Sequence, residues 1–275
     1  MITSPTQVLC INRKITEQPV DPKQAAFVDR FAQGCGGALV SAQQATALPA
    51  THPWCIRGMK FTESVRLCWN TDRTFYYIDN GYFGNPGRKE WFRIIKNHVH
   101  TVGPIVDRPR DRLDRCSLKL KPFTTGSKIL IAPPSEKSFS LWKINQAEWI
   151  DNTVNQIKQY TDRPIEIRLK RKREDRMRHD TMEEALDRDV HCLVTYNSVA
   201  AVEALMLGKP AITLGPNAAG VLCSNSLSDI DAPRIPTVDE RDAWLRHLSY
   251  CQFTYQEMQD GTAWRILQEN HECVD

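Results

Sequence analysis

Hydrophobic and polar positions follow two rhythms along the chain, and together they predict an α/β protein. Short apolar runs rich in branched and aromatic residues, flanked by turn residues, are typical of buried strands. We expect strands at residues 8–11, 53–58, 75–78, 91–95, 128–132, 164–169, 192–194 and 211–214, with a weaker one at 65–69. Apolar residues at helical spacing predict helices at residues 22–34, 141–160, 181–186, 199–207, 239–248 and 255–269. This alternation indicates parallel sheets flanked by helices.

The clearest part of the pattern is a β-α-β unit near the middle of the second half. A buried strand at 192–194 is followed by the polar residues 196–198 and then by an apolar helix at 199–207. Gly208 is a typical C-terminal stop for that helix, and the strand at 211–214 follows at once. The second strand therefore returns very quickly after the helix.

The first junction of this unit has candidate chemistry. Asn197 or Ser198 can cap the helix, and the amides that follow are free donors at the positive end of its dipole. Such a junction is a ready site for phosphate. Glu203 lies on the first turns of the same helix, where a carboxylate can accept hydrogen bonds from two ribose hydroxyls. An ordinary capped helix in a parallel sheet, with Glu203 solvated, explains the same residues.

Composition and length are those of a soluble globular protein. The 275 residues include 41% apolar and 25% charged residues, and no apolar run approaches the ~18 residues of a membrane span. The N-terminus lacks the pattern of a signal peptide, and the nine cysteines include no CxxC pair. We expect reduced thiols, no zinc site and a cytoplasmic location, which is the host cytoplasm if the protein is viral.

Charge is distributed unevenly along the sequence. Residues 1–125 contain 18 Lys and Arg against 10 Asp and Glu, whereas residues 126–275 contain 18 against 23. The best boundary is the segment 122–126, because the strand and helix rhythm becomes regular beyond it. A basic first half suggests that it contacts something anionic, although a chance distribution over solvated surfaces explains the same counts.

One carboxylate in the first half has a suggestive position. The strand predicted at 75–78 ends in Asp79, followed by Asn80 and Gly81. Proteins of the α/β class place catalytic and ligand-binding groups at the C-terminal ends of strands. A hairpin turn signalled by Asn-Gly is the competing interpretation.

The order of elements after residue 126 resembles the nucleotide-binding lobe of GT-B glycosyltransferases, most closely the capsule-polysaccharide-type transferases. The resemblance is carried by residues 197–210, which match the family pattern of Asn-Ser-Ser, small residues, Glu-Ala, three residues and Gly-Lys-Pro. It implies a compact GT-B fold with two Rossmann-like lobes. Residues 1–125 would form the acceptor-binding lobe, and residues 126–275 the lobe that binds the nucleotide sugar.

The resemblance also implies roles for individual residues. The Ser cap and helix amides would hold the donor phosphates, Glu203 the ribose, and the basic strand end at 168–171 would face the phosphates. That strand end lacks the His and Pro of the family's Lys-Pro-His-Pro motif. Asp79 would be the general base, although it is shifted by one residue from the family's Glu-Asp-Gly-Phe motif. The implied donor-binding residues are Arg168, Lys170, Thr195, Asn197, Ser198 and Glu203.

The donor implied by the resemblance is a nucleotide sugar, most simply a UDP-sugar, used without a metal. Helix amides and basic side chains can stabilise a leaving diphosphate in place of a metal ion. A carboxylate is still needed to take the proton of the acceptor hydroxyl. Asp229 and Asp231 have the spacing of an Asp-x-Asp metal motif, but they lie in a Ser-rich segment that we interpret as a turn.

The acceptor is the least constrained part of the prediction. Basic residues interleaved with aromatic ones suit a nucleic-acid groove. The aromatic residues concerned are Trp54, Trp69, Phe75, Tyr76, Tyr77, Tyr82, Phe83, Trp91 and Phe92. The chain is compact for its class and is reminiscent of virus-encoded transferases, so the leading hypothesis is sugar transfer to a hydroxymethylated pyrimidine in phage DNA, with the base flipped out.

Three other interpretations stay open. Most of these aromatic rings are expected in a core, which would leave no groove. The acceptor would then be a capsule or cell-surface polysaccharide or a lipid-linked glycan. The third alternative is a GT-B-like protein that binds a nucleotide or a nucleic acid without turnover.

Overall fold

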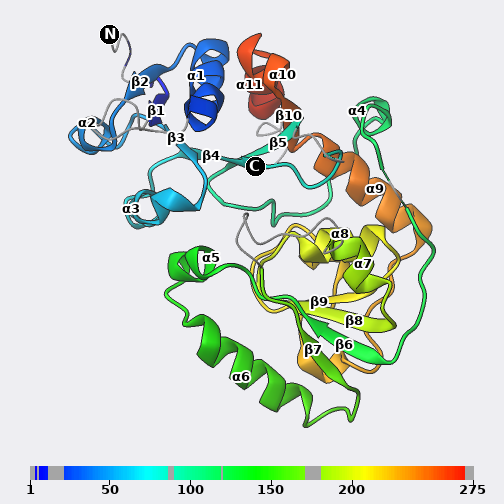
Figure 1. Cartoon of the computed structure of the whole chain (residues 1–275). Helices are drawn as coiled ribbons and strands as arrows, with labels where there is room; N and C mark the ends of the chain where they lie inside the picture. Colours follow the sequence, from blue (N-terminus) through cyan, green and yellow to red (C-terminus); the bar gives the residue numbers. More distant parts are fainter. Residues whose placement is uncertain are drawn as a thin grey trace. The chain divides into compact units, whose positions relative to one another are not determined.

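The computed structural model describes residues 4, 6–11, 22–85, 90–118, 120–170 and 181–269. The chain divides into two compact units (Figure 1). Unit 1 comprises residues 1–99 and 249–275, and unit 2 comprises residues 100–248. No helix in the described ranges has both the length and the apolar character needed to cross a lipid bilayer.

Unit 1 is built on a six-stranded sheet. Its strands are β1 (Leu9–Ile11), β2 (Ala38–Val40), β3 (Trp54–Arg57), β4 (Phe75–Asn80), β5 (Trp91–Lys96) and β10 (Gln252–Thr254), in the order β10-β5-β4-β3-β1-β2. The four strands β2, β1, β3 and β4 are parallel, whereas β5 and β10 run antiparallel to their neighbours. Its helices are α1 (Pro22–Cys35), α2 (Ala42–Thr46), α3 (Thr62–Asn70), α10 (Tyr255–Gln259) and α11 (Thr262–Glu269).

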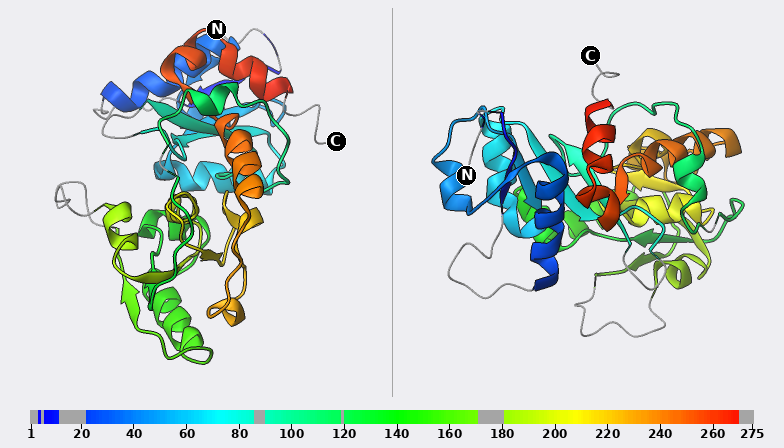
Figure 2. Two further views of the ribbon diagram at one scale, coloured as in Figure 1. Left: turned by 90° about the vertical axis from the view of Figure 1, so that its right-hand side faces the viewer. Right: turned by 90° about the horizontal axis from the view of Figure 1, so that it is seen from above.

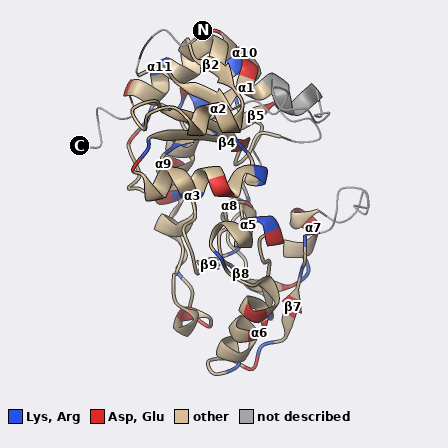
Figure 3. Ribbon diagram, turned by 90° about the vertical axis from the view of Figure 1, so that its left-hand side faces the viewer, with Lys and Arg blue, Asp and Glu red and all other residues tan. Residues whose placement is uncertain are grey.

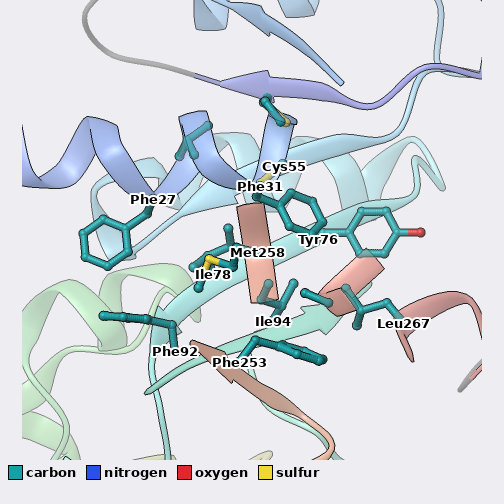
Figure 4. Close-up of a cluster of buried hydrophobic side chains, with 14 of the residues drawn as sticks. Phe27, Phe31, Cys55, Tyr76, Ile78, Phe92, Ile94, Phe253, Met258 and Leu267 are labelled. Carbon is teal, nitrogen blue, oxygen red and sulfur yellow. The ribbon is translucent and has the colours of Figure 1, made fainter. Parts of the chain in front are cut away.

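The hydrophobic core of unit 1 joins the two ends of the chain. Phe27 and Phe31 of α1 pack with Phe92 of β5 and with Phe253 and Met258 from the C-terminal segment (Figure 4). The rings of Phe27 and Phe92 meet edge to face, with centroids 4.5 Å apart. Because β10 also pairs with β5, the C-terminal segment is an integral part of unit 1.

Unit 2 is built on a four-stranded parallel sheet. Its strands are β6 (Lys128–Ile131), β7 (Ile165–Ile167), β8 (Val190–Thr195) and β9 (Ala211–Thr213), in the order β7-β6-β8-β9. Its α-helices are α4 (Asp111–Asp114), α5 (Glu136–Leu141), α6 (Gln146–Ile157), α7 (Met182–Leu186), α8 (Ala200–Met206) and α9 (Val238–Ser249). Helix α6 covers one face of the sheet, and α7 and α8 cover the other (Figures 1 and 2).

Local sequence explains why several of these elements begin and end where they do. Thr181 and Glu184 form the capping box of α7 that their spacing predicts. Gly208 ends α8 with a φ of +73°, and a Cβ at this position would lie 2.0 Å from the carbonyl oxygen of Pro122. Only glycine satisfies both conditions. The rapid return from α8 to β9 therefore depends on this residue.

The structure confirms the predicted α/β class and parallel sheets flanked by helices, and it corrects several elements. The predicted strand at 65–69 is wrong, because Val65 and Cys68 bury one face of helix α3 at a helical spacing of three. The helix predicted at 141–160 is shorter, spanning only α6 (Gln146–Ile157), and Lys143 with a positive φ of +56° separates it from the preceding helix α5, which ends at Leu141. Helix α2 and the strands β2 and β10 were not predicted.

The two units differ in extent from the predicted division at residue 125. The segment after residue 99 packs into unit 2, where the amides of Lys121 and Thr124 donate to the carbonyls of Met206 and Gly208. Residues 249–269 pack into unit 1, because β10 adds to its sheet. Contacts between segments that are distant in the sequence determine to which unit these two segments belong. The local hydrophobic pattern contains no information on such contacts.

Candidate functional site

The buried side chain of Thr195 stabilises the β8–α8 junction of unit 2 from the protein interior. This side chain is fully buried, and its Oγ1 donates to the carbonyl of Ala132 at 2.6 Å. The same oxygen accepts from the amide of Ser198 at 3.4 Å. Thr195 therefore links the ends of β6 and β8 and shapes the turn, and it is not itself open to a ligand.

Asn197 and Ser198 have different environments, although both were expected to cap the helix. Asn197 is 2% exposed, its Oδ1 accepts from Ser138 Oγ at 3.1 Å, and its Nδ2 has no partner among the described residues. The helix begins one residue later than expected, with Val199 at the N-cap and no side-chain cap. Ser198 Oγ nevertheless accepts from the amide of Ala200 at 3.2 Å, so this amide is already occupied.

Glu203, Arg168 and Lys170 form the charged part of the junction. Arg168 follows β7 directly, and its amide donates to the carbonyl of Ile131. Burial raises the pKa of the Glu203 carboxyl, and the positive charges of Arg168 and Lys170 lower it in part. No side-chain hydrogen bond engages this carboxyl within the described ranges. The sequence prediction that these three residues belong to one site is therefore compatible with their electrostatic coupling.

A cavity of about 550 Å³ adjoins this junction within unit 2. It is lined by the C-terminal end of β9, the loop that follows, and residues 102–104. Asn217 belongs to this lining, and its Nδ2 donates to the carbonyl of Ser198 at 2.9 Å. The cavity therefore lies at the carboxyl edge of a parallel sheet, where α/β proteins bind ligands.

Asp79 of unit 1 lies at the end of β4 in a dense polar network. Its Oδ1 accepts from Arg57 Nη1 at 3.0 Å and from the amide of Asn80 at 2.8 Å. Its Oδ2 accepts from the hydroxyl of Tyr77 at 3.0 Å and from Arg93 Nη2 at 3.4 Å. Both carboxylate oxygens are thus engaged twice, and 20% of the side chain is exposed.

This network determines the protonation of Asp79. Burial raises the pKa of its carboxyl, but Arg93, Arg57 and the hydrogen bonds from Asn80 and Tyr77 together outweigh burial and hold that pKa well below its usual range. A general base works best when its pKa lies near the operating pH. The contacts therefore make Asp79 a weak proton acceptor and a strong anchor for two arginines. Its assignment as the catalytic base stays a prediction.

The two arginines on Asp79 were not recognised as site residues from the sequence. Arg93 interrupts the apolar run of β5, and its guanidinium lies between the rings of Tyr77 and Tyr82, 5.9 and 5.5 Å from their centroids. A charged residue inside an otherwise buried strand needs a partner, and this is the signal that could have identified it. Arg57 ends β3 directly beside β4.

The aromatic residues and the basic charge that suggested a nucleic-acid groove in the first half do not form such a surface in the folded chain. Eight of the nine aromatic residues considered are buried, and the ninth, Trp69, donates its Nε1 to the carbonyl of Asn97. Unit 1 contains 13 Lys and Arg against 12 Asp and Glu, and unit 2 contains 23 against 21. Figure 3 shows basic and acidic residues interspersed along the elements of the chain. The charge asymmetry of the sequence halves is therefore not a property of the folded units.

The Asp-x-Asp spacing at 229–231 has a structural explanation. Asp231 accepts from Arg163 Nε at 2.9 Å and from the Thr161 hydroxyl at 2.8 Å. Asp229 ends a short 3-10 helix. Within the described residues, no three His, Cys, Asp or Glu side chains are grouped so that they could hold a metal ion. Eight cysteines of the described part are free thiols. Arg171, which belongs to the basic strand end, lies outside the described residues.

Comparison with known proteins gives limited information. No family model matches the chain, and no curated protein matches its sequence. Two solved structures from Thermosulfurimonas dismutans are similar, the KpsC β-Kdo 2,4 transferase and the KpsC β-Kdo 2,7 transferase, both at 12% identity. The first match covers 89% of this chain and 91% of its own, with a TM-score of 0.48; the second covers 94% and 99%, with a TM-score of 0.49. With TM-scores below 0.5, neither likeness decides the fold or the activity of this chain.

Proposed function

We propose that the protein is a glycosyltransferase that transfers a sugar from a nucleotide sugar to an acceptor hydroxyl. The observation that carries this proposal is the half-buried Glu203 carboxyl, coupled to Arg168 and Lys170 at the carboxyl edge of the parallel sheet of unit 2. A carboxyl with a shifted pKa and no hydrogen-bond partner of its own, near two cations, is typical of a ligand site.

Each side chain has a distinct role in the proposed donor site. Glu203 accepts hydrogen bonds from the ribose hydroxyls, and Arg168 and Lys170 neutralise the donor phosphates. Ser198 and the backbone of the junction complete the phosphate site, whereas Thr195 and Asn197 hold the turn in position from the interior. The adjoining cavity has room for part of the nucleotide. Because positive side chains stabilise the phosphate charge of the leaving nucleotide, the proposed reaction needs no metal.

The acceptor we favour is a glycan, as in a capsule or cell-surface polysaccharide. DNA is not supported as the acceptor, because eight of the nine aromatic rings considered are buried and unit 1 is almost neutral. The experiment below also tests the two alternatives, sugar transfer to a hydroxymethylated base and nucleotide binding without turnover.

The test is incorporation of a labelled sugar. The full chain is incubated with labelled UDP- and CMP-sugars and with three acceptors: an acidic oligosaccharide, a neutral oligosaccharide and hydroxymethylated DNA. We expect incorporation into an oligosaccharide, lost in Glu203→Gln and retained in Lys158→Gln, a change of exposed charge in the same unit. Incorporation into DNA alone would overturn the glycan acceptor. Nucleotide binding with no transfer from any donor would overturn the enzymatic proposal.

A further inference from the structure

The cavity of about 550 Å³ that adjoins the β8–α8 junction has an unused hydrogen-bonding group in its wall. Thr213, in strand β9, lines this cavity and is only 4% exposed. None of the described residues forms a hydrogen bond with the Thr213 hydroxyl. Its oxygen is not one of the unpartnered side-chain atoms that the protein encloses completely, so it is open to the cavity. A nearly buried residue whose hydroxyl is accessible and unpaired is typical of a ligand site.

A second polar side chain in the wall is also available. Asn225 lines the cavity with an exposed side chain, and no described residue hydrogen-bonds its side-chain amide. Asn217 is instead engaged at both ends: its Nδ2 donates to the carbonyl of Ser198 and its Oδ1 accepts from the amide of Ala219, each at 2.9 Å. Asn217 therefore fixes the wall against the junction, whereas Thr213 and Asn225 can both donate and accept hydrogen bonds.

The rest of the described wall is largely apolar, and none of it is charged. Val102 and Val221 contribute exposed side chains, and Leu214, Pro104 and Pro216 lie beside them. Large apolar side chains that stay exposed around a concave surface indicate a binding site. The described lining includes no Lys, Arg, His, Asp or Glu. A carboxylate in this cavity would lose water without gaining a counter-charge, which is unfavourable.

The position of the cavity along the sheet indicates which part of the donor it faces. In the strand order β7-β6-β8-β9, the proposed phosphate site lies at the end of β8, and the cavity lies at the end of β9. Glu203, the proposed ribose acceptor, is coupled to Arg168 and Lys170, which follow β7 on the other side of the phosphate site. The phosphate of a nucleotide sugar stands between the nucleoside and the sugar. With the ribose on the β7 side, the group that extends toward β9 is the sugar.

We propose that this cavity binds the sugar of the donor and that this sugar is uncharged. Sugar hydroxyls both donate and accept hydrogen bonds, as do the Thr213 hydroxyl and the Asn225 amide. The C–H face of a pyranose suits the apolar part of the wall. A nucleobase would stack best on an aromatic ring, and the described lining includes none. This inference rests on the proposed donor site, because it names the class of sugar that is donated.

Binding of matched nucleotide sugars tests the inference without requiring turnover. The full chain is titrated by calorimetry with UDP and with two pairs of UDP-sugars whose members differ only in a carboxylate at C6. The pairs are UDP-glucose with UDP-glucuronic acid and UDP-galactose with UDP-galacturonic acid. We expect the wild-type protein to bind the neutral member of each pair about tenfold or more tightly, because the cavity offers the carboxylate no counter-charge.

Two variants locate the sugar in the cavity. Thr213→Val keeps the shape of the side chain but removes the hydroxyl, so it should weaken binding of the neutral UDP-sugars about three- to tenfold and leave UDP binding unchanged. Asn225→Lys supplies a counter-charge and should shift the preference within each pair toward the acidic sugar by about tenfold. Thr125→Val, the same chemical change at an exposed residue of the same unit, should change nothing.

Several results would overturn the assignment. The first is equal or tighter binding of the acidic sugars by the wild-type protein, which decides the matter even where a variant fails to fold. The second is an unchanged affinity for the neutral UDP-sugars in Thr213→Val, and the third is an equal weakening of UDP itself, which would place the nucleotide in the cavity. Failure of UDP to bind also overturns it. CMP titrated in the same samples then separates the two proposals: if CMP binds, the proposed donor site stands, and if neither nucleotide binds, both proposals fail.

Discussion

Two carboxylates, Asp79 at the end of β4 in unit 1 and Glu203 on helix α8 in unit 2, are held in opposite ways. Asp79 is surrounded by four donors, and its pKa lies well below the usual range because these donors together outweigh burial. Glu203 has no side-chain hydrogen bond within the described ranges, and burial raises its pKa although Arg168 and Lys170 oppose the effect. The first group is satisfied by the protein, whereas the second has unused acceptor capacity among the described residues, which is the basis of the ribose-binding role that we propose.

This difference separates an anchor from a binding residue. Both positions follow the same rule, since both lie near the carboxyl ends of parallel strands. The number of protein donors around each carboxylate gives them different functions. The following variants test this contrast.

The largest effect is expected at Asp79. Asp79→Ala leaves Arg57 and Arg93 without their shared counter-charge, and breaking a buried ion pair in this way costs about 3–5 kcal/mol. Glu203→Gln should change stability by less than about 0.5 kcal/mol. Hydrogen exchange in β3 and β4, compared with β8, measures the two effects separately. Equal destabilisation by the two changes would contradict the distinction between anchor and binding residue.

A second effect concerns the backbone that supports the unit 2 junction. Gly208→Ala combines a positive φ with a Cβ 2.0 Å from the carbonyl oxygen of Pro122, so we expect a loss of about 3 kcal/mol. Gly36→Ala in unit 1 has a positive φ but open space around the Cβ, and should cost only about 1 kcal/mol. Chemical denaturation measures both. A similar cost for the two variants would show that the contact with Pro122 is unimportant.

The units should also differ in their response to acid. Burial, and to a lesser degree the positive charge of Arg108, lowers the pKa of His247 of unit 2 to about 4. Its Nδ1 accepts from the amide of Val106, as the neutral ring requires. The unfolded chain binds a proton below about pH 6.5 and the folded chain only near pH 4, so stability falls as the pH decreases between these values.

The loss attributable to His247 should reach about 2 kcal/mol at pH 5. His191 shifts in the same direction, so the difference between the wild-type protein and His247→Gln isolates the contribution. The pKa of Asp79 is also lowered, but its contribution to stability is lost in a more acidic range: it is complete above about pH 4 and declines only below it. Unit 1 should therefore be unaffected at pH 5, as hydrogen exchange at pH 5 and 7 can check. A parallel decline of both units would contradict this assignment.

Much of unit 2 could be predicted from the sequence because its signals are local. The strand at 192–194, the glycine stop at 208 and the capping box of α7 each depend on neighbouring residues. The electrostatic coupling of Glu203 with Arg168 agrees with the expectation that strand ends and the following helix share one edge of a sheet.

Other features could not be predicted because distant pairings decide them. Asn197 is buried, and its Oδ1 accepts a hydrogen bond from Ser138, which lies 59 residues earlier in the sequence. Its side chain therefore does not cap helix α8. The engagement of Asp79 depends on β4 pairing with both β3 and β5, which brings Arg57 and Arg93 to it. The basic character of the first half disappears because the acidic C-terminal segment completes unit 1.

Nucleotide affinity tests the central claim most directly. Calorimetric titration of UDP and CMP into the full chain should show binding at one site per chain. We predict that Glu203→Gln weakens it about tenfold or more, because the ribose loses a charged acceptor. Lys158→Gln should leave it unchanged. Unaltered affinity in Glu203→Gln, or no nucleotide binding by the wild-type protein, would contradict the proposal that unit 2 holds the donor.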